Sequence, residues 1–251
     1  MDQRYFIQLS FKGTNYHGWQ IQPNAISVQE VLEKSLSTLL REEISVVGAG
    51  RTDTGVHASF FVLHFDSLQQ DLDSGNFVFK LNRFLPADIG IHKIIKAGND
   101  AHARFSAASR TYQYFVATDK NPFSTDTSFY YSGNLDMCKM NEAAAILFEY
   151  EDFTSFSRLH TDVKTNNCKI FLANWKKEGS QLIFTIKADR FLRNMVRAIV
   201  GTLLEVGKGK ITVEDFRQII EKKDRGVAGA SAPAQGLFLT DIEYPEEIVK
   251  F

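Results

Sequence analysis

The chain alternates short strand patterns with amphipathic helix patterns along its whole length. Residues 4–13 alternate polar and apolar side chains as a half-buried strand does, and residues 27–40 repeat leucine and valine at helical spacing. Ser27 with Glu30 three residues later is typical of a capping box, which fixes where that helix begins. A chain that mixes both periodicities in this way is predicted to have an α+β fold.

The same patterns recur in both halves of the 251 residues, with no low-complexity linker between them. They predict two subdomains, residues 1–107 and 108–251, that meet near Phe105–Arg110 and share one mixed, mostly antiparallel sheet around a central cleft. The spacing of apolar residues and the positions of turn residues predict the remaining elements. Strands are predicted over residues 44–50, 60–66, 89–97, 110–118 and 236–244, with a strand pair over residues 169–188 turning at Glu178–Gly179. Helices are predicted over residues 75–85, 137–149, 190–206 and 212–223.

The composition excludes several classes of protein. Apolar and charged residues make up 44% and 24% of the chain, which argues against a disordered or fibrous protein. A formal net charge of −1 means that a nucleic-acid partner would have to be bound by basic residues clustered locally. No secretory signal and no membrane-spanning apolar run is found, so we expect a cytoplasmic protein. Two cysteines without a CxxC spacing, Cys138 and Cys168, are expected to be buried thiols.

Three motif matches fail on spacing. "DTG" at Asp53 and "DSG" at Asp73 are too close together to come from the two lobes of an aspartic protease, and a dimeric protease would have short all-β subunits. "GTLLEVGKGK" has one residue too many between its glycines for a phosphate-binding loop, and it fits a helix that ends at glycines. The six histidines are scattered without metal-ligand spacing, so no metal site is predicted.

"GAGRTDTGVHA", residues 48–58, places a carboxylate where a predicted strand ends. Side chains project into clefts from such positions, and Gly55 allows a tight turn. Arg51, two residues before Asp53 in an extended chain, would point the same way and keep the carboxylate ionised. From these residues alone, Asp53 is either a functional carboxylate or a polar cap of its own turn.

Two further groups of residues suit contacts with RNA. Arg190, Arg193 and Arg197 are spaced to form one stripe of the predicted helix, which suits phosphate groups, although such a stripe is also common on a face that only meets solvent. Tyr112 and Tyr114 would face one side of a strand, either packed in the core or stacked on a base. Other basic residues could extend the stripe: Lys187, Arg104 and Arg110.

"GAGRTDTGVHA" closely resembles the signature of the tRNA pseudouridine synthase A family, "GRTDAGVHA", around a nucleophilic aspartate. Further stretches agree in order over nearly the whole chain: "YHGWQIQP", "SVQEVLEKSL", "HARFSAASRTYQY", "DFTSF", "FLRNMVRAIVG" and "SAPAQGLFL". The resemblance implies two ferredoxin-like or RRM-like α/β subdomains around a central cleft, in a homodimer. It also implies an isomerase that converts uridines on the 3′ side of the tRNA anticodon stem-loop to pseudouridine, with neither cofactor nor metal.

The resemblance implies roles for single residues as well. Asp53 would be the catalytic carboxylate, and Arg51 would assist base flipping. Tyr112 would pack on the target base and is a candidate for handling its proton. Arg197 would pair with the aspartate, and Leu237 would form an apolar wall of the pocket.

Because the net charge is near zero, the phosphates of a tRNA would be bound by local basic residues, which are Arg190, Arg193, Arg110 and Arg104. Thr54 and Ala198 depart from the residues usual in the family, though neither touches the implied chemistry. His57, four residues after Asp53, could shape the loop or contact RNA. The alternative that remains is a non-catalytic tRNA-binding or RNA-chaperone protein of the same fold that has lost turnover.

Overall fold

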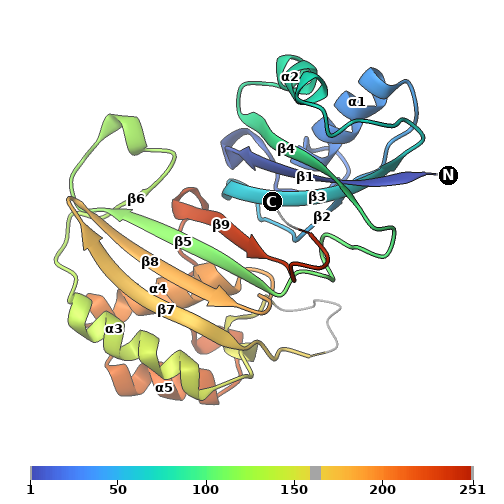
Figure 1. The fold of residues 1–251 in the computed structure, drawn as a ribbon. Helices are drawn as coiled ribbons and strands as arrows, with labels where there is room; N and C mark the ends of the chain where they lie inside the picture. Colours follow the sequence, from blue (N-terminus) through green and yellow to red (C-terminus); the bar gives the residue numbers. More distant parts are fainter. Residues whose placement is uncertain (1, 159–164, 250–251) are drawn as a thin grey trace. The chain divides into compact units, whose positions relative to one another are not determined.

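The computed structural model describes residues 2–158 and 165–249 of the chain (Figure 1). The polypeptide divides into two compact units, residues 1–109 with 239–251 and residues 110–238. Each unit combines strands with helices, so the predicted α+β class is confirmed.

The first unit is built on strands in the order β4-β1-β3, with β2 paired to β3, and these pairings are all antiparallel. The chain runs β1-α1-β2-β3-α2-β4, which is the ferredoxin-like arrangement. In Figure 1, both helices lie on the same face of the sheet. The bounds are β1 Gln3–Phe11, α1 Val28–Leu40, β2 Val47–Gly48, β3 His57–Ser67, α2 Gly75–Phe84 and β4 Ile89–Ala97.

Helix α1 begins where its capping residue predicts. The Ser27 hydroxyl accepts a hydrogen bond from the Glu30 N–H at 3.2 Å, which satisfies one of the free donors of the first turn. Three side chains of its apolar stripe are fully buried: Val28, Leu32 and Leu36. The helical spacing of these residues therefore predicts which face of α1 packs on the core.

The second unit repeats this topology with strands in the order β9-β5-β8-β7 and a short strand β6 parallel to β5. Its chain order, β5-α3-β7-β8-α4-β9, is again ferredoxin-like, with α5 inserted before the last strand. Strand β9 runs from this unit into the first. The bounds are β5 Ser109–Ala117, β6 Phe129–Tyr130, α3 Met137–Ile146, β7 Ile170–Glu178, β8 Gln181–Ala188, α4 Met195–Gly207, α5 Val213–Glu221 and β9 Leu237–Glu243.

The predicted helix over residues 190–206 is wrong at its start. Helix α4 begins only at Met195, because Asn194 has a left-handed backbone with a φ of 65°, which an α-helix does not include. Arg190 and Arg193 therefore precede the helix, and only Arg197 of the predicted arginine stripe is helical.

The two cysteines are free thiols in the structure. Cys168 is buried, as expected from the sequence, and burial raises the pKa of its thiol to about 12. Cys138 lies on α3 and is exposed, so the expectation of a buried thiol is wrong for this residue.

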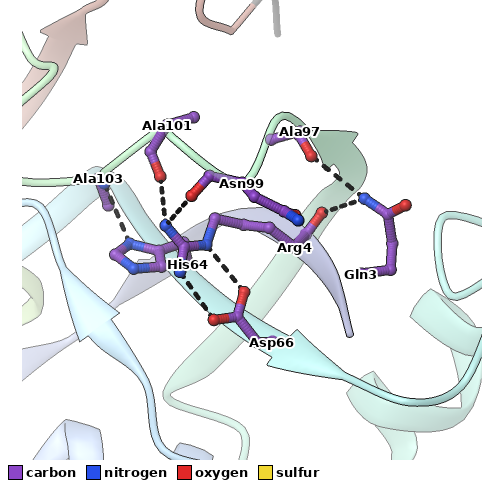
Figure 2. A network of polar contacts seen from close by, with 8 residues as sticks. All are labelled: Gln3, Arg4, His64, Asp66, Ala97, Asn99, Ala101 and Ala103. Atoms are coloured by element: carbon purple, nitrogen blue, oxygen red, sulfur yellow. Dashed lines mark hydrogen bonds and ion pairs between the residues drawn. The ribbon is translucent and has the colours of Figure 1, made fainter. Parts of the chain in front are cut away.

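A polar network in the first unit fastens the chain after β4 to the sheet (Figure 2). Arg4 on β1 makes a bidentate pair with Asp66 on β3, with N–O distances of 2.8 and 2.7 Å. Its Nη1 also donates to the carbonyls of Asn99 and Ala101, at 2.8 and 2.9 Å. Asn99 and Ala101 are thus held against β1 by a side chain that is itself fixed by an ion pair.

His64 on β3 contributes to the same fastening through a neutral imidazole. Its Nδ1 accepts a hydrogen bond from the Ala103 N–H at 3.0 Å (Figure 2), which requires a free lone pair on that nitrogen. Burial, together with the nearby Arg4 and His102, lowers the pKa of His64 to about 4. The imidazole therefore stays uncharged in the folded protein at neutral pH.

This lowered pKa makes the stability of the protein depend on pH. The ordinary pKa of histidine is 6.5 and that of folded His64 is about 4, so the unfolded chain binds the extra proton between these values. We expect the free energy of unfolding to fall as the pH is lowered from 7 towards 4, by at most about 1.4 kcal/mol per pH unit from this one group. His64→Asn keeps an oxygen acceptor for Ala103 and removes the titration, so urea unfolding of this variant should show a shallower pH dependence than the wild type. Parallel curves for the two proteins would contradict the assignment.

Candidate active site

Asp53 lies in the loop that joins β2 to β3, on a tight turn. The turn is closed by the Val56 N–H, which donates to the Asp53 carbonyl at 3.1 Å. Gly55 within it has a φ of 77°, a conformation that favours glycine. Thr52 is buried, whereas Asp53 is half-buried and Arg51 is exposed. The predicted carboxylate and guanidinium thus both reach the surface of the loop, on either side of a buried threonine.

A second loop, over residues 13–19, holds this turn in place. It follows β1, and its backbone makes two hydrogen bonds to the turn: the Trp19 N–H donates to the Thr52 carbonyl, and the Gly55 N–H donates to the Tyr16 carbonyl, both at 3.3 Å. We call residues 13–19 the clamp loop. Because its bonds fall on either side of Asp53, they fix the position of the carboxylate-bearing residue along the chain.

Two glycines allow the clamp loop to approach this closely. A Cβ on Gly18 would lie 2.4 Å from the Thr52 carbonyl oxygen, and Gly18 also has a φ of 85°. A Cβ on Gly13 would lie 2.0 Å from the Val56 carbonyl oxygen. Both distances are far below van der Waals contact with backbone atoms, so any side chain at either position would push the Asp53 turn away.

Aromatic residues of the clamp loop anchor it in the first unit. Trp19 packs against Phe61 of β3 with ring centroids 4.2 Å apart, and it fills the space next to Gly48, where a Cβ would meet the indole at 2.5 Å. The Tyr16 hydroxyl donates to Asp88 Oδ1 at 2.5 Å. Burial, with a contribution from Asp88, raises the pKa of Tyr16 well above its ordinary value, so this hydroxyl remains a donor.

His57, whose role the sequence left open, shapes the loop. Its side chain is only 1% exposed, at the start of β3. Its Nδ1 accepts a hydrogen bond from the Gly13 N–H at 3.0 Å, which ties the end of the Asp53 turn to the clamp loop. A side chain this deeply buried is a packing and hydrogen-bonding element rather than an RNA contact.

The sequence alone does not indicate that the clamp loop supports the Asp53 turn. The stretch "YHGWQIQP" contributes only to the family resemblance. The available signal was the pair of glycines that flank aromatic residues directly after a strand, since isolated glycines near strands often mark close backbone approach. Nothing in the sequence identifies which backbone atoms they approach.

In the second unit, the start of β5 is joined to the loop before α4. Tyr112 on β5 is half-buried, and its ring meets Phe191 edge-on with centroids 5.2 Å apart. Arg110 Nη1 donates to the Asp189 carbonyl at 2.9 Å. The Asp189 carboxylate accepts from the Arg190 N–H at 2.7 Å. Tyr112, Arg110 and Arg190 therefore belong to one connected piece of structure, which includes residues far apart in sequence.

Arg197 holds a different segment of the second unit. From the first turn of α4, its Nε donates to the Ala232 carbonyl at 2.8 Å, and its own carbonyl accepts from the Ala232 N–H at 2.9 Å. Tyr114 is fully buried, and its hydroxyl donates to the Pro233 carbonyl at 2.8 Å, so it belongs to the core rather than to an RNA-stacking surface. Leu237, at the start of β9, is 5% exposed.

The predicted site residues thus fall into two sets. The first unit holds Arg51, Asp53 and Arg104, and the second unit holds Arg110, Tyr112, Arg190, Arg193, Arg197 and Leu237. Within the second set, Arg193 is exposed, whereas Arg190 and Arg197 are half-buried. The individual roles of these residues remain predictions.

Within residues 2–158 and 165–249, no three side chains of histidine, cysteine, aspartate or glutamate come together in a geometry that could hold a metal ion. In the same residues, every helix is too short or too polar to cross a membrane.

Comparisons with known proteins agree along nearly the whole chain. A family model described as tRNA pseudouridine synthase matches residues 8–106 and 143–245. Proteins named tRNA pseudouridine synthase A are similar to the chain: that of Bacteroides fragilis is 59% identical over 98% of both chains, and that of Bacteroides thetaiotaomicron is 60% identical over 98% of this chain and 92% of its own. That of Bacillus subtilis is 39% identical over 94% of this chain and 97% of its own. With the ferredoxin-like units and the Asp53 turn, these matches show that the chain belongs to the tRNA pseudouridine synthase family.

Proposed function

We propose that this synthase isomerises uridines on the 3′ side of the anticodon stem-loop of tRNA, with Asp53 as the catalytic carboxylate. The assignment of Asp53 rests on the turn over residues 53–56. The clamp loop holds this turn from outside, while the Asp53 side chain stays partly accessible. An aspartate that only capped its own turn would not need this second loop around it. Rigid support of this kind is what a reacting group requires.

The reaction explains why a carboxylate is central. Pseudouridine formation breaks the N1–C1′ bond, turns the freed uracil in the pocket, and joins C5 to C1′, while the hydrogen on C5 leaves as a proton and N1 gains one. The atoms of the nucleoside are otherwise conserved, and no electrons are transferred to a second molecule. The step needs an ionised carboxylate close to the ribose, able either to attack covalently or to take a proton from the sugar.

The remaining site residues are proposed to manage the extruded base. A uridine must leave its stack before it can react, at a cost of a few kcal/mol, so a group is needed to fill the gap and another to hold the ring. Arg51, exposed beside Asp53, suits the first task, and Tyr112, half-buried beside Phe191, suits the second. Arg197 is proposed to pair with the aspartate, and Leu237 to line the pocket.

The phosphates of the tRNA are proposed to bind the basic residues of the two units, which are Arg104, Arg110, Arg190 and Arg193. The near-zero net charge of the chain supports this, because a tRNA-binding protein without an overall positive charge must bind phosphate locally.

We further propose that the protein works as a homodimer in the cytoplasm, where the two free thiols would remain reduced.

Asp53→Asn tests the catalytic assignment directly. The amide is nearly isosteric but cannot act as an anionic nucleophile or base, so we expect turnover to fall by about a thousandfold or more while tRNA binding persists. Tritium release from tRNA labelled at uridine C5 measures the reaction, and filter binding measures affinity. Thr54→Ala, a change at the neighbouring exposed residue, serves as the control and should turn over normally. Substantial release by Asp53→Asn would refute the role of this aspartate.

Gly18→Ala tests whether the clamp loop positions the turn. The added Cβ would meet the Thr52 carbonyl, so the turn must shift, and a displacement of about 1 Å can cost about a hundredfold in kcat. The dissociation constant for tRNA should change little, because the phosphate contacts are elsewhere. Gly50→Ala is the matched control, since a Cβ there meets nothing within 4 Å. Equal rates for the two variants would exclude the proposed positioning.

Arg190→Ala combined with Arg193→Ala tests the proposed phosphate contacts. We expect weaker tRNA binding and a slope of log Kd against log salt concentration that is smaller by about 2, one for each lost contact. The single-turnover rate at saturating tRNA should not change. Lys176→Ala with Lys177→Ala removes the same charge from exposed positions on β7 and should leave the slope unaltered. An unchanged Kd for the arginine variant at moderate salt would mean that both side chains are only solvated.

A further inference from the structure

The segment after β4 displays one large aromatic side chain on an otherwise well-packed loop. Phe105 is 77% exposed, whereas Ala101 and Ala103 in the same segment are almost completely buried. Single apolar side chains on a surface are common and need no explanation by themselves. The unusual feature is how firmly the backbone beneath this ring is held.

His102 organises the loop around Phe105. Its Nδ1 accepts hydrogen bonds from the N–H groups of Arg104 and Phe105, at 3.1 and 3.2 Å. The backbone N–H of His102 donates to the Ser106 hydroxyl at 3.0 Å, and the backbone carbonyl of His102 accepts from the Ser106 N–H at 2.9 Å. Arg104, Phe105 and Ser106 are therefore all bonded to His102 within the loop.

The rest of the first unit fixes this loop from below. The Ala103 N–H donates to His64 and its carbonyl accepts from the Tyr244 hydroxyl at 2.6 Å. Arg4 donates to the carbonyls of Asn99 and Ala101, as described above. All of these bonds are made by side chains to the loop backbone, and none depends on the phenylalanine side chain. A smaller or polar residue at position 105 would be compatible with the same loop.

The ring of Phe105 is itself oriented. The His102 ring lies 4.4 Å from it between centroids at an interplanar angle of 32°, and the Arg104 guanidinium carbon lies 5.6 Å from its centroid. A flat apolar ring that is held from one side and accompanied by a positive charge is the arrangement with which proteins stack unpaired bases of single-stranded RNA. Preorganisation of this kind lowers the entropy lost on binding.

We propose that Phe105 stacks on an unpaired nucleobase of the tRNA substrate, other than the uridine being isomerised, with Arg104 adding positive charge at the same place. The inference rests on the proposed function, because it takes tRNA as the ligand, and it adds a binding residue that the sequence did not identify. Phe105 is a binding residue and not a catalytic one.

The test compares Phe105→Ala with Phe105→Leu, Phe105→Tyr and Phe105→Trp, using unmodified tRNA as the probe. Stacking predicts that the alanine variant raises the Kd by about tenfold, that leucine restores little, and that tyrosine and tryptophan restore binding to within about twofold. The single-turnover rate at saturating tRNA should be the same for all. Emission from the tryptophan variant should be quenched by tRNA beyond the change seen with the wild type, because the native Trp19 and Trp175 are buried.

Phe79→Ala is the matched control. Phe79 lies on α2 of the same unit, is 61% exposed, and has the Arg83 guanidinium carbon 5.9 Å from its ring centroid. Its removal should leave the Kd unchanged, and the thermal midpoints of both alanine variants should equal that of the wild type, because neither ring is buried.

Three results of the binding measurements would overturn the inference: wild-type affinity for Phe105→Ala, equal rescue by leucine and tyrosine, or the same loss of affinity in Phe79→Ala. A change in oligomeric state in place of the change in Kd would assign the ring to a protein interface and also overturn it.

The proposed function is tested separately by the wild-type protein. If the wild type binds tRNA through Phe105 but releases no tritium, the proposed function fails while stacking stands. If the wild type turns over and Phe105→Ala binds equally well, only this inference fails.

Discussion

The contact between Gly18 and the Thr52 carbonyl determines where the candidate catalytic aspartate can be. Only a residue without a Cβ can bring the clamp loop so close to the turn, and only this approach lets the Trp19 N–H reach the carbonyl next to Asp53. The sheet alone would not hold the turn, because β2 has just two residues and ends before Arg51. The carboxylate is therefore supported by a backbone interaction across two loops, and the aromatic side chains of the clamp loop connect that interaction to the core.

The second set of site residues is held by a loop before a helix, and not by a close approach of two loop backbones. Around Tyr112 and Arg110, the support comes from a loop that ends in a left-handed asparagine, and this conformation delays the start of α4 until Met195. A helix over residues 190–206 would have placed three arginines on one straight stripe. The observed loop instead gives each arginine its own environment, with Arg193 exposed and Arg197 bonded to the Ala232 backbone.

Much of the fold could be predicted from the sequence, because it depends on local patterns. The Ser27 N-cap, the leucines of α1 and the hairpin at Glu178–Gly179 all act within a few residues, and the structure has them where the patterns indicate, although only the Ser27 half of the predicted capping box is formed. The beginning of α4 could not be predicted in this way, since the apolar spacing continues through residue 194 while its backbone is left-handed.

The site was predictable to a lesser extent, for a related reason. The Asp53 turn is visible in the sequence because glycine and aspartate mark turns locally. The clamp that fixes the turn depends on the distance between Gly18 and Thr52, which are far apart along the chain, and sequence periodicity does not report such distances. The role of His57 could not be decided from the sequence for the same reason, because its hydrogen-bond partner is the N–H of Gly13, which is far from it along the chain.

Three histidines of the first unit serve the same purpose, which is to hold the backbone of a loop. His57, His64 and His102 each use Nδ1 to accept a backbone N–H group of a loop. Burial lowers the pKa of His64 and of His102, which favours the neutral ring that such bonds need. Arginine guanidinium groups do not titrate near neutral pH, so the positive charge of the arginines proposed to bind phosphate does not change there. The hydrogen bonds of the loops and the charge of these arginines can thus both stay constant over the neutral pH range.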